Sequence, residues 1–186
     1  TLETDALLVA VGRTPNVDGL GLEAAGVAYD AVHGVTVDDR LRTTNPRVYA
    51  VGDACSPFKF THAADFQARL VVQNALFFGR GRASALVTPW VTYTSPEVAH
   101  VGLTEAEARA RGTPVDVVTV EMGDVDRAVI DGEAEGFCRV LLARGTDRIV
   151  GCTLVSAHAG ETISEVTLAM TARVGLAAIG RTMHPY

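Results

Sequence analysis

Three β-rich segments in series, followed by an amphipathic helix, constrain the fold of this chain more than any other feature. Residues 115–120 (VDVVTV), 137–142 and 149–155 are rich in β-branched and apolar side chains, and residues 145–147 predict a tight turn between the last two. Residues 160–174 repeat apolar side chains at helical spacing. Strands in series with a helix on one face favour an α+β layer over a parallel βαβ repeat.

The first part of the chain shows a different order. Residues 6–11 (ALLVAV) form a continuous apolar run closed by Gly12, a pattern typical of a strand buried on both faces. Residues 48–51 (VYAV) predict a second buried strand, which ends in Gly52 and Asp53, and residues 61–79 predict a helix.

Shorter elements are expected between these segments. Residues 20–25 predict a brief helix and residues 35–37 a half-exposed strand, whereas residues 90–93 are β-rich. Residues 96–102 are expected to lead into a helix that begins after Thr104 and runs to about Gly112. Thr104 is followed three residues later by Glu107, which predicts a capping box at the start of that helix. The glycine-rich residues 79–82 indicate a linker, so we place a domain boundary near residue 85 and expect domains at 1–85 and 86–186.

Composition excludes several classes of protein. No apolar run reaches the roughly 18–20 residues that cross a bilayer, so we expect no membrane association. A net charge of −6 without a basic stripe argues against nucleic acid as a partner. Three scattered cysteines do not support a disulfide scaffold or a zinc site, and we expect no metal ligands and a reducing cytoplasmic location. Since the sequence does not begin with methionine, we expect an internal or C-terminal piece of a longer protein.

The end of the second predicted strand is the first place where chemistry can be located. Asp53 directly follows this strand and Gly52, at the kind of sheet edge where α/β folds bind ligands. A carboxylate there suits hydrogen bonds from sugar or ribityl hydroxyls. The helix that begins eight residues later, near Thr61, presents free N–H groups that favour an anion. The alternative is a strand-end turn followed by a packing helix.

Three motifs, in order, resemble one family. Residues 43–53 (TTNPRVYAVGD) are similar to the second FAD-binding motif of the pyridine nucleotide–disulfide oxidoreductases, residues 6–16 (ALLVAVGRTPN) to the segment that closes their NAD(P)-binding domain, and residues 89–104 to the opening of their dimerisation domain. The resemblance covers nearly the whole chain. It implies an α/β remnant of the NAD(P)- and FAD-binding domains followed by an α+β dimerisation domain.

The same resemblance implies a function for the parent enzyme. Hydride would pass from NAD(P)H to FAD, and electrons would then reach a cysteine pair and a metal ion or a small-molecule disulfide, as in mercuric reductases and dihydrolipoamide dehydrogenases. We expect a homodimer. The Gly-rich fingerprints and the redox cysteines of the family lie outside these residues, and Cys55, Cys138 and Cys152 do not replace them. The chain by itself is therefore expected to be inactive. The alternative is a non-catalytic dimerisation module without bound cofactor.

Individual cofactor contacts follow from the matched motifs. Gly12 matches the glycine whose backbone approaches the nicotinamide dinucleotide, although it could equally be a turn glycine. Gly52 and Asp53 match the pair at the ribityl–pyrophosphate region of FAD. Thr61 falls where the helix start faces the flavin pyrimidine, and His62 follows it as a neighbour of the flavin site.

The last three residues, His184, Pro185 and Tyr186, are similar to a variant of the family's His-Pro motif. In this register Tyr186 occupies the position of the general base, and His184 lies two residues before it. Tyrosine, with a reference pKa near 10, is a poor base at neutral pH. If the register slips, His184 itself is the base. Glu161 and Glu165 lie four residues apart, and we expect both on a solvated helix face.

Overall fold

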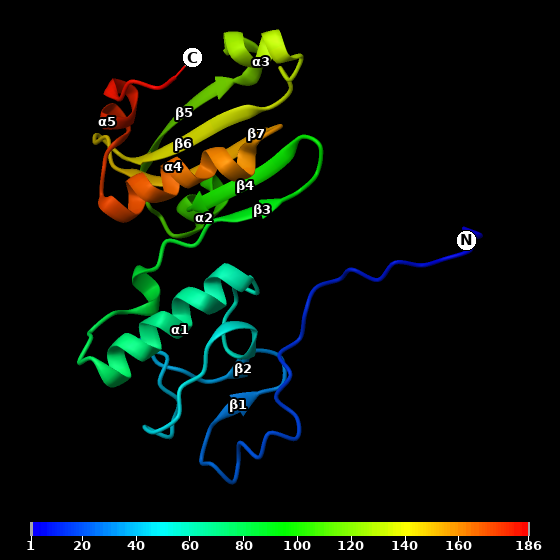
Figure 1. The fold of residues 1–186 in the computed structure, drawn as a ribbon, viewed down its shortest axis with the longest axis vertical. Coiled ribbons are helices and arrows are strands. Elements are labelled where there is room, and N and C mark those ends of the chain that lie inside the picture. Colours follow the sequence, from blue (N-terminus) through cyan, green and yellow to red (C-terminus); the bar gives the residue numbers. More distant parts are fainter. Residues whose placement is uncertain (1, 186) are drawn as a thin grey trace. The chain divides into compact units, whose positions relative to one another are not determined.

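The computed structural model describes residues 2–185, and the chain divides into two compact units with the boundary in the sequence between Ala85 and Leu86 (Figure 1). The second unit is built on a five-stranded antiparallel sheet with strand order β3-β4-β7-β6-β5. Its strands are β3 (Trp90–Thr92), β4 (Glu97–Gly102), β5 (Val115–Glu121), β6 (Phe137–Ala143) and β7 (Ile149–Ser156).

The three expected strands β5, β6 and β7 are confirmed, as is the turn between the last two. Ala143 N–H donates to Arg148 O at 2.9 Å and Thr146 N–H to Ala143 O at 3.0 Å, which closes the β6–β7 hairpin. The interpretation of residues 96–102 was incomplete, because they form β4. This strand pairs with β3 on one side and β7 on the other, and these long-range hydrogen bonds decide its conformation.

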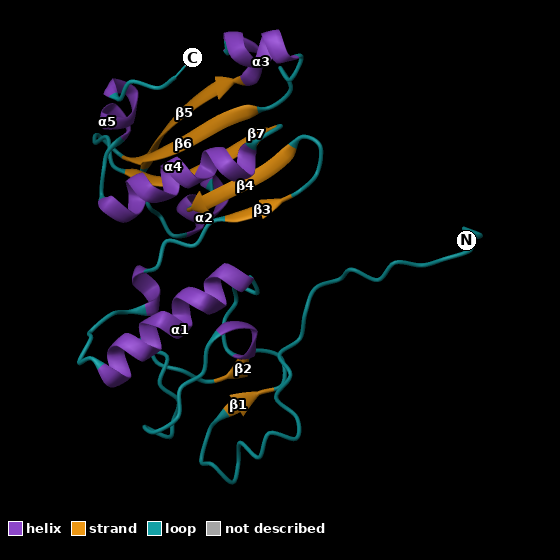
Figure 2. Ribbon diagram, in the orientation of Figure 1, coloured by secondary structure: helices purple, strands orange, loops and turns teal. Residues whose placement is uncertain are grey.

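Helix α4 (Ala159–Ala172) confirms the helix expected near residues 160–174 and lies across the sheet in Figure 2. Ile163 on this helix is 1% exposed and packs in one cluster with Val101 and Cys152 of the sheet. Burial of such a side chain contributes roughly 1.5–3 kcal/mol. The sheet and α4 therefore enclose the main hydrophobic core of this unit.

Three further helices complete the second unit: α2 (Glu105–Ala110), α3 (Asp126–Asp131) and α5 (Leu176–Arg181), the last two not anticipated from the sequence. A short 3₁₀ turn, η3 (Met122–Asp124), precedes α3. The capping box before α2 is confirmed. Thr104 Oγ1 accepts from Glu107 N–H at 3.2 Å, and the Glu107 carboxylate accepts from Thr104 N–H at 2.9 Å.

The first unit contains one long helix, α1 (Thr61–Leu76), as expected from residues 61–79. Around it lie two 3₁₀ turns, η1 (Gly52–Ala54) and η2 (Ala83–Ala85), and a two-stranded ladder of β1 (Tyr29–Asp30) and β2 (Gly34–Val35). A small core gathers the buried side chains Val17, Val27 and Val35.

The strand expected at residues 6–11 is not formed in this chain. The segment is extended and pairs with no strand among the described residues, and its side chains are exposed, Leu8 by 89% and Val11 by 91%. A strand buried on both faces requires neighbouring strands to accept its backbone hydrogen bonds and layers to cover it. The described residues provide neither.

Three other expected elements of the first unit are also wrong or shortened. Residues 48–51 form no strand, and Tyr49 makes only an isolated bridge with Arg42. Residues 20–25 are turns closed by bonds such as Val27 N–H to Leu22 O, because no long amphipathic face supports a helix there. Only Val35 of the strand expected at 35–37 lies in β2. Among the described residues no helix is both long and apolar enough to span a bilayer.

The packing of α4 on the sheet gives a direct test of this fold. Replacing Ile163 by Ala should lower the free energy of unfolding by about 2–5 kcal/mol, because a cavity remains in a close-packed site. The matched control is Leu168→Ala on the same helix, whose side chain is 67% exposed. Urea unfolding followed by circular dichroism measures both. Equal losses for the two variants would contradict the assigned face of α4.

Candidate functional site

The turn at Gly52 and Asp53 lies directly against helix α1. Gly52 has φ +66°, a left-handed conformation that glycine adopts without strain. A Cβ on this residue would lie 2.8 Å from the Cβ of Ala64 on α1, so a side chain would also clash with the helix. The glycine thus allows the backbone to turn and α1 to pack closely on it.

A buried polar network holds the same turn. Gly52 N–H donates to Gln67 Oε1 at 2.8 Å, and Gln67 Nε2 donates to Ser56 Oγ at 3.1 Å. Gln67 and Ser56 are both buried. Lys59 Nζ donates to the backbone oxygens of Asp53 and Ser56, each at 3.0 Å. The segment from Gly52 to Ser56 is therefore fixed through its backbone, and the Asp53 side chain, which takes no part in this network, is 40% exposed.

Sequence reasoning did not identify Gln67, Ser56 or Lys59. One signal was present in the helix pattern, since Gln67 shares a face with Ala63 and Leu70, and all three are buried. A polar side chain on the buried face of a helix requires a hydrogen-bond partner, and the backbone of the neighbouring turn supplies it.

Arg13 pairs with Asp53 across 40 residues of sequence, with Arg13 Nη1 donating to Asp53 Oδ2 at 2.8 Å. The side chains are 66% and 40% exposed, so the pair stabilises the fold by less than about 1 kcal/mol. Gly12, with φ +103°, precedes this arginine. The structure thus brings the segment at Gly12 to the Asp53 turn through an ion pair that no sequence pattern indicated.

The start of helix α1 adds donors to the site. Its N-cap, Phe60, makes no side-chain capping bond, and the first turn contains no acidic residue, so the positive end of the helix is not neutralised by its own first turn. Thr61 and His62 are both exposed there. The His62 ring stacks on Phe60, with 5.3 Å between centroids and 5° between planes.

These groups form a set that suits a flavin. The outward carboxylate of Asp53 accepts hydrogen bonds from hydroxyl groups, and the amides of the first turn of α1 donate to carbonyl or anionic groups. Both lie on elements that pack directly against each other, the η1 turn and α1. The residues present therefore fit a ligand that carries polyhydroxyl and electron-accepting parts.

A second pair lies near the end of the chain, in the other unit. His184 Nε2 and Glu165 Oε1 are 2.8 Å apart, and each side chain is nearly half exposed. The hydrogen bond with Glu165 and its negative charge raise the pKa of His184 above the ordinary 6.5. Glu161 and Glu165 are exposed on α4 as expected, but Glu165 also holds His184. Tyr186, the other proposed base, lies outside the described residues.

The three cysteines are free thiols that differ in burial: Cys55 and Cys138 are partly buried and Cys152 is buried. Burial raises the pKa of Cys55. Cys138 and Cys152 are diagonal neighbours on β6 and β7. The neighbouring Cys138 thiol and burial raise the pKa of Cys152. Cys152 is completely buried, so it serves the core as a small apolar side chain.

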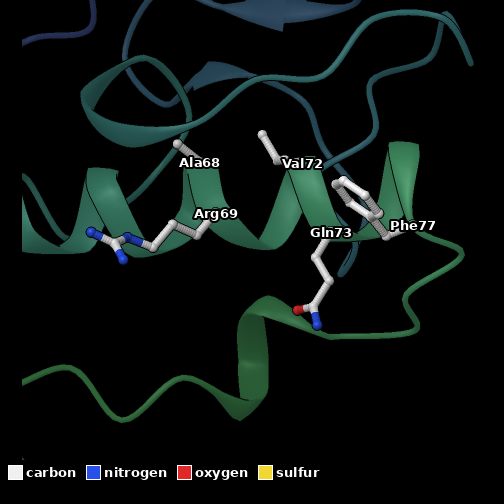
Figure 3. Close-up of a pocket in the computed structure, with 5 residues that line it drawn as sticks. All are labelled: Ala68, Arg69, Val72, Gln73 and Phe77. Carbon is white, nitrogen blue, oxygen red and sulfur yellow. The ribbon is translucent and has the colours of Figure 1, made fainter.

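A shallow apolar hollow of about 460 Å³ lies on another face of α1 (Figure 3). Its lining residues are Ala68, Arg69, Val72, Gln73 and Phe77. It includes none of the residues around Asp53 and no acid. A hollow of this composition lacks the convergent polar groups of a catalytic site.

Comparison with known proteins identifies the family. A family model described as the dimerisation domain of pyridine nucleotide-disulphide oxidoreductases matches residues 88–186, and a second model, described as pyridine nucleotide-disulphide oxidoreductase, matches residues 1–68. The chain belongs to the pyridine nucleotide-disulphide oxidoreductase family, as the three motifs indicated.

Individual relatives agree with this assignment. The chain is 40% identical over 182 residues to a dihydrolipoyl dehydrogenase of Thermus scotoductus, with 98% of this chain and 39% of the relative aligned. It is 36% identical over 180 residues to a mercuric reductase of Streptomyces lividans, with 97% of this chain and 38% of the relative aligned. The chain thus spans about two fifths of the length of these curated relatives.

A solved structure gives the same result for the fold. The HOCl-induced flavoprotein disulfide reductase RclA from Escherichia coli superposes with a TM-score of 0.86 at 28% sequence identity, over 98% of this chain and 42% of that chain. A Cu(II) complex of the same protein superposes with a TM-score of 0.87.

The His184–Glu165 pair gives a prediction about titration. Replacing Glu165 by Gln removes the negative charge and should move the pKa of His184 down towards its ordinary value. The stability that the pair contributes should be complete below the unfolded pKa of histidine and disappear as pH rises through the higher folded value. Proton NMR titration of the imidazole measures the shift.

The matched control for this titration is Glu161→Gln, one helical turn away on α4, which leaves the His184 contact intact. A pKa of His184 that is unchanged in Glu165→Gln, or that falls equally in Glu161→Gln, would contradict the pairing.

Proposed function

We propose that this chain is part of an FAD-dependent oxidoreductase that oxidises NAD(P)H and passes electrons to a cysteine pair and then to a metal ion or a disulfide. The observation that carries the proposal is the partly exposed carboxylate of Asp53, which pairs with Arg13 and follows a glycine packed against the first turn of α1. The two family models and the flavoprotein among the solved neighbours support it.

In this proposal the first unit contributes FAD contacts. Asp53 would accept hydrogen bonds from the ribityl chain, with Gly52 allowing the backbone to approach. The amides near Thr61 and His62 would face the electron-accepting part of the flavin ring, where the helix dipole favours negative charge. FAD, when bound, supplies two-electron chemistry between the nicotinamide and the thiols. Gly12 would lie close to the nicotinamide dinucleotide.

Arg13 has a supporting role in the same proposal. It approaches Asp53 from the segment at Gly12 and keeps a positive charge beside the carboxylate. Because the contact is exposed, we expect Arg13 to assist the orientation of Asp53 rather than to determine flavin affinity.

The second unit would build a homodimer, for which the dimerisation-domain match is the main support. Strand β5 is an edge of the sheet and exposes Val117, Val118 and Val120, and α3 exposes Val129 and Ile130. Unpaired edges and exposed apolar side chains are typical of surfaces that another chain covers. A two-fold, self-complementary contact is the usual arrangement for such a dimer.

The end of the chain bears on the electron acceptor. With Tyr186 at the base position and His184 held by Glu165, the parent enzyme would lack a free imidazole beside its thiols. A disulfide acceptor needs a proton delivered to its leaving thiolate, whereas a thiol-bound metal ion needs little proton transfer. We therefore favour a metal ion over a disulfide as acceptor. The relatives include both mercuric reductases and dihydrolipoyl dehydrogenases, so this choice rests on the end of the chain alone.

The flavin contact is tested by Asp53→Asn in the full-length protein that contains these residues. Loss of charge-assisted hydrogen bonds worth about 1.5–3 kcal/mol should weaken FAD binding about 10- to 150-fold. Fluorescence titration of the apoprotein with FAD measures the dissociation constant. The matched control is Asp65→Asn, an exposed aspartate of α1 that pairs with Arg69.

An unchanged dissociation constant in Asp53→Asn would refute the proposed contact. A full-length protein that purifies without flavin and does not bind added FAD would instead support the alternative of a dimerisation module without cofactor.

The acceptor is tested at Tyr186. Replacing Tyr186 by His in the full-length enzyme should raise reduction of glutathione disulfide or lipoamide, because a group that titrates near neutrality is restored. Tyr186→Phe should impair metal-ion reduction more than flavin reduction by NAD(P)H. Steady-state assays with each acceptor measure these effects. Rapid disulfide turnover by the unmodified enzyme would refute this account and assign the base to His184.

A further inference from the structure

The buried side chain of Gln67 has a function that neither the motifs nor the family match assigns. We propose that Gln67, acting with Ser56, is a positioning residue that fixes the Gly52–Asp53 turn in the conformation that binds flavin. The inference rests on the proposed function, because it takes Asp53 to be a flavin contact. Gln67 itself lies beneath the turn and acts through the backbone.

Both ends of the Gln67 amide are used. Its oxygen accepts from Gly52 N–H at 2.8 Å, and its nitrogen donates to Ser56 Oγ at 3.1 Å. Ser56 Oγ also accepts from Phe58 N–H at 3.1 Å, which ties the next residues of the loop to the same centre. One side chain thus joins the start and the end of the loop to helix α1. To bond both Gly52 and Ser56, the side chain must carry an acceptor and a donor side by side, as an amide does.

The consequence for Asp53 follows from the position of Gly52. The residue before Asp53 has φ +66°, and Gln67 holds its N–H, so the direction in which the Asp53 side chain leaves the backbone is set. Lys59 fixes the carbonyl on the other side of Asp53 at 3.0 Å. Without Gln67 the buried N–H of Gly52 has no acceptor in this arrangement, and the turn must shift to reach one.

A purely structural role for Gln67 makes a different prediction. If Gln67 only stabilises the packing of α1, its removal lowers the stability of the protein but leaves the flavin affinity of the folded fraction unchanged. If it acts through Asp53, the affinity falls, and the fall depends on the presence of the Asp53 carboxylate. A double-mutant cycle separates the two roles.

The experiment uses the full-length apoprotein and FAD as the probe. Gln67→Met keeps a similar length without hydrogen-bonding groups, and it should raise the dissociation constant of FAD about tenfold relative to the unmodified protein. In an Asp53→Asn background the same change should raise it less than about threefold. The matched control is Gln73→Met, on the exposed side of the same helix, for which no change is expected.

Ser56→Ala provides a second variant if Gln67→Met does not fold. It removes the acceptor of the Gln67 amide nitrogen but leaves the hydrogen bond to Gly52. FAD affinity should therefore fall less than in Gln67→Met, and the fall should again depend on the Asp53 carboxylate. For either variant, a loss of FAD affinity that is equal in the unmodified and Asp53→Asn backgrounds would overturn the inference. So would an unchanged dissociation constant in the variant with intact Asp53.

The outcomes distinguish this inference from the proposed function. If Asp53→Asn weakens FAD binding and Gln67→Met leaves it unchanged, only the role of Gln67 is overturned. An Asp53→Asn protein with unchanged affinity overturns the flavin contact and, with it, this inference. A tenfold loss of FAD affinity in Gln67→Met that vanishes in the Asp53→Asn background supports both the flavin contact of Asp53 and the positioning role of Gln67.

Discussion

The close approach of helix α1 to the Gly52 turn is the contact on which the candidate site depends. A glycine with φ +66° lies where a Cβ would touch Ala64, and its N–H reaches the buried amide of Gln67. Neither feature works alone, because the hydrogen bond forms only when the helix is this near, and the helix comes this near only when residue 52 lacks a side chain. The turn then presents Asp53 outward beside the first turn of α1.

The second unit shows a different balance of forces. Its sheet is held together by long antiparallel pairings, and α4 packs on it, with Ile163 and Cys152 in the shared core. Among the described residues, every buried side-chain polar atom has a hydrogen-bond partner. The exposed parts of this unit are the edge strand β5, with its exposed valines, and the end of the chain, where Glu165 contacts His184. In the proposed enzyme, the edge strand serves association, and the first unit serves the cofactor.

Much of the second unit could be predicted because its signals are local. The β-branched composition of residues 115–120, the turn at Gly145 and the capping box at Thr104 each depend on a few neighbouring residues. Strand β4 was missed because its conformation is decided by two distant partners. The run at 6–11 has the composition of a buried strand, but a strand forms only where others pair with it.

The site was predictable only in outline. The position of Asp53 after a glycine and before a helix could be inferred from the order of residues, and the family motif sharpened it. Its partners could not, because Arg13 lies 40 residues away and Gln67 was hidden in a helix that reads as ordinary amphipathic sequence. The same holds for His184 and Glu165, which are 19 residues apart and meet only through the fold of the second unit. The partners in such contacts are set by tertiary packing.

The central claim is that the Asp53 turn and the start of α1 form a flavin site. Hydrogen–deuterium exchange of the full-length apoprotein, with and without FAD, tests it most directly, since exchange reports amides that a ligand covers or orders. FAD should slow exchange at residues 52–56 and 61–63 and leave β6 unchanged. Exchange at residues 52–63 that is the same with and without bound FAD would contradict the account.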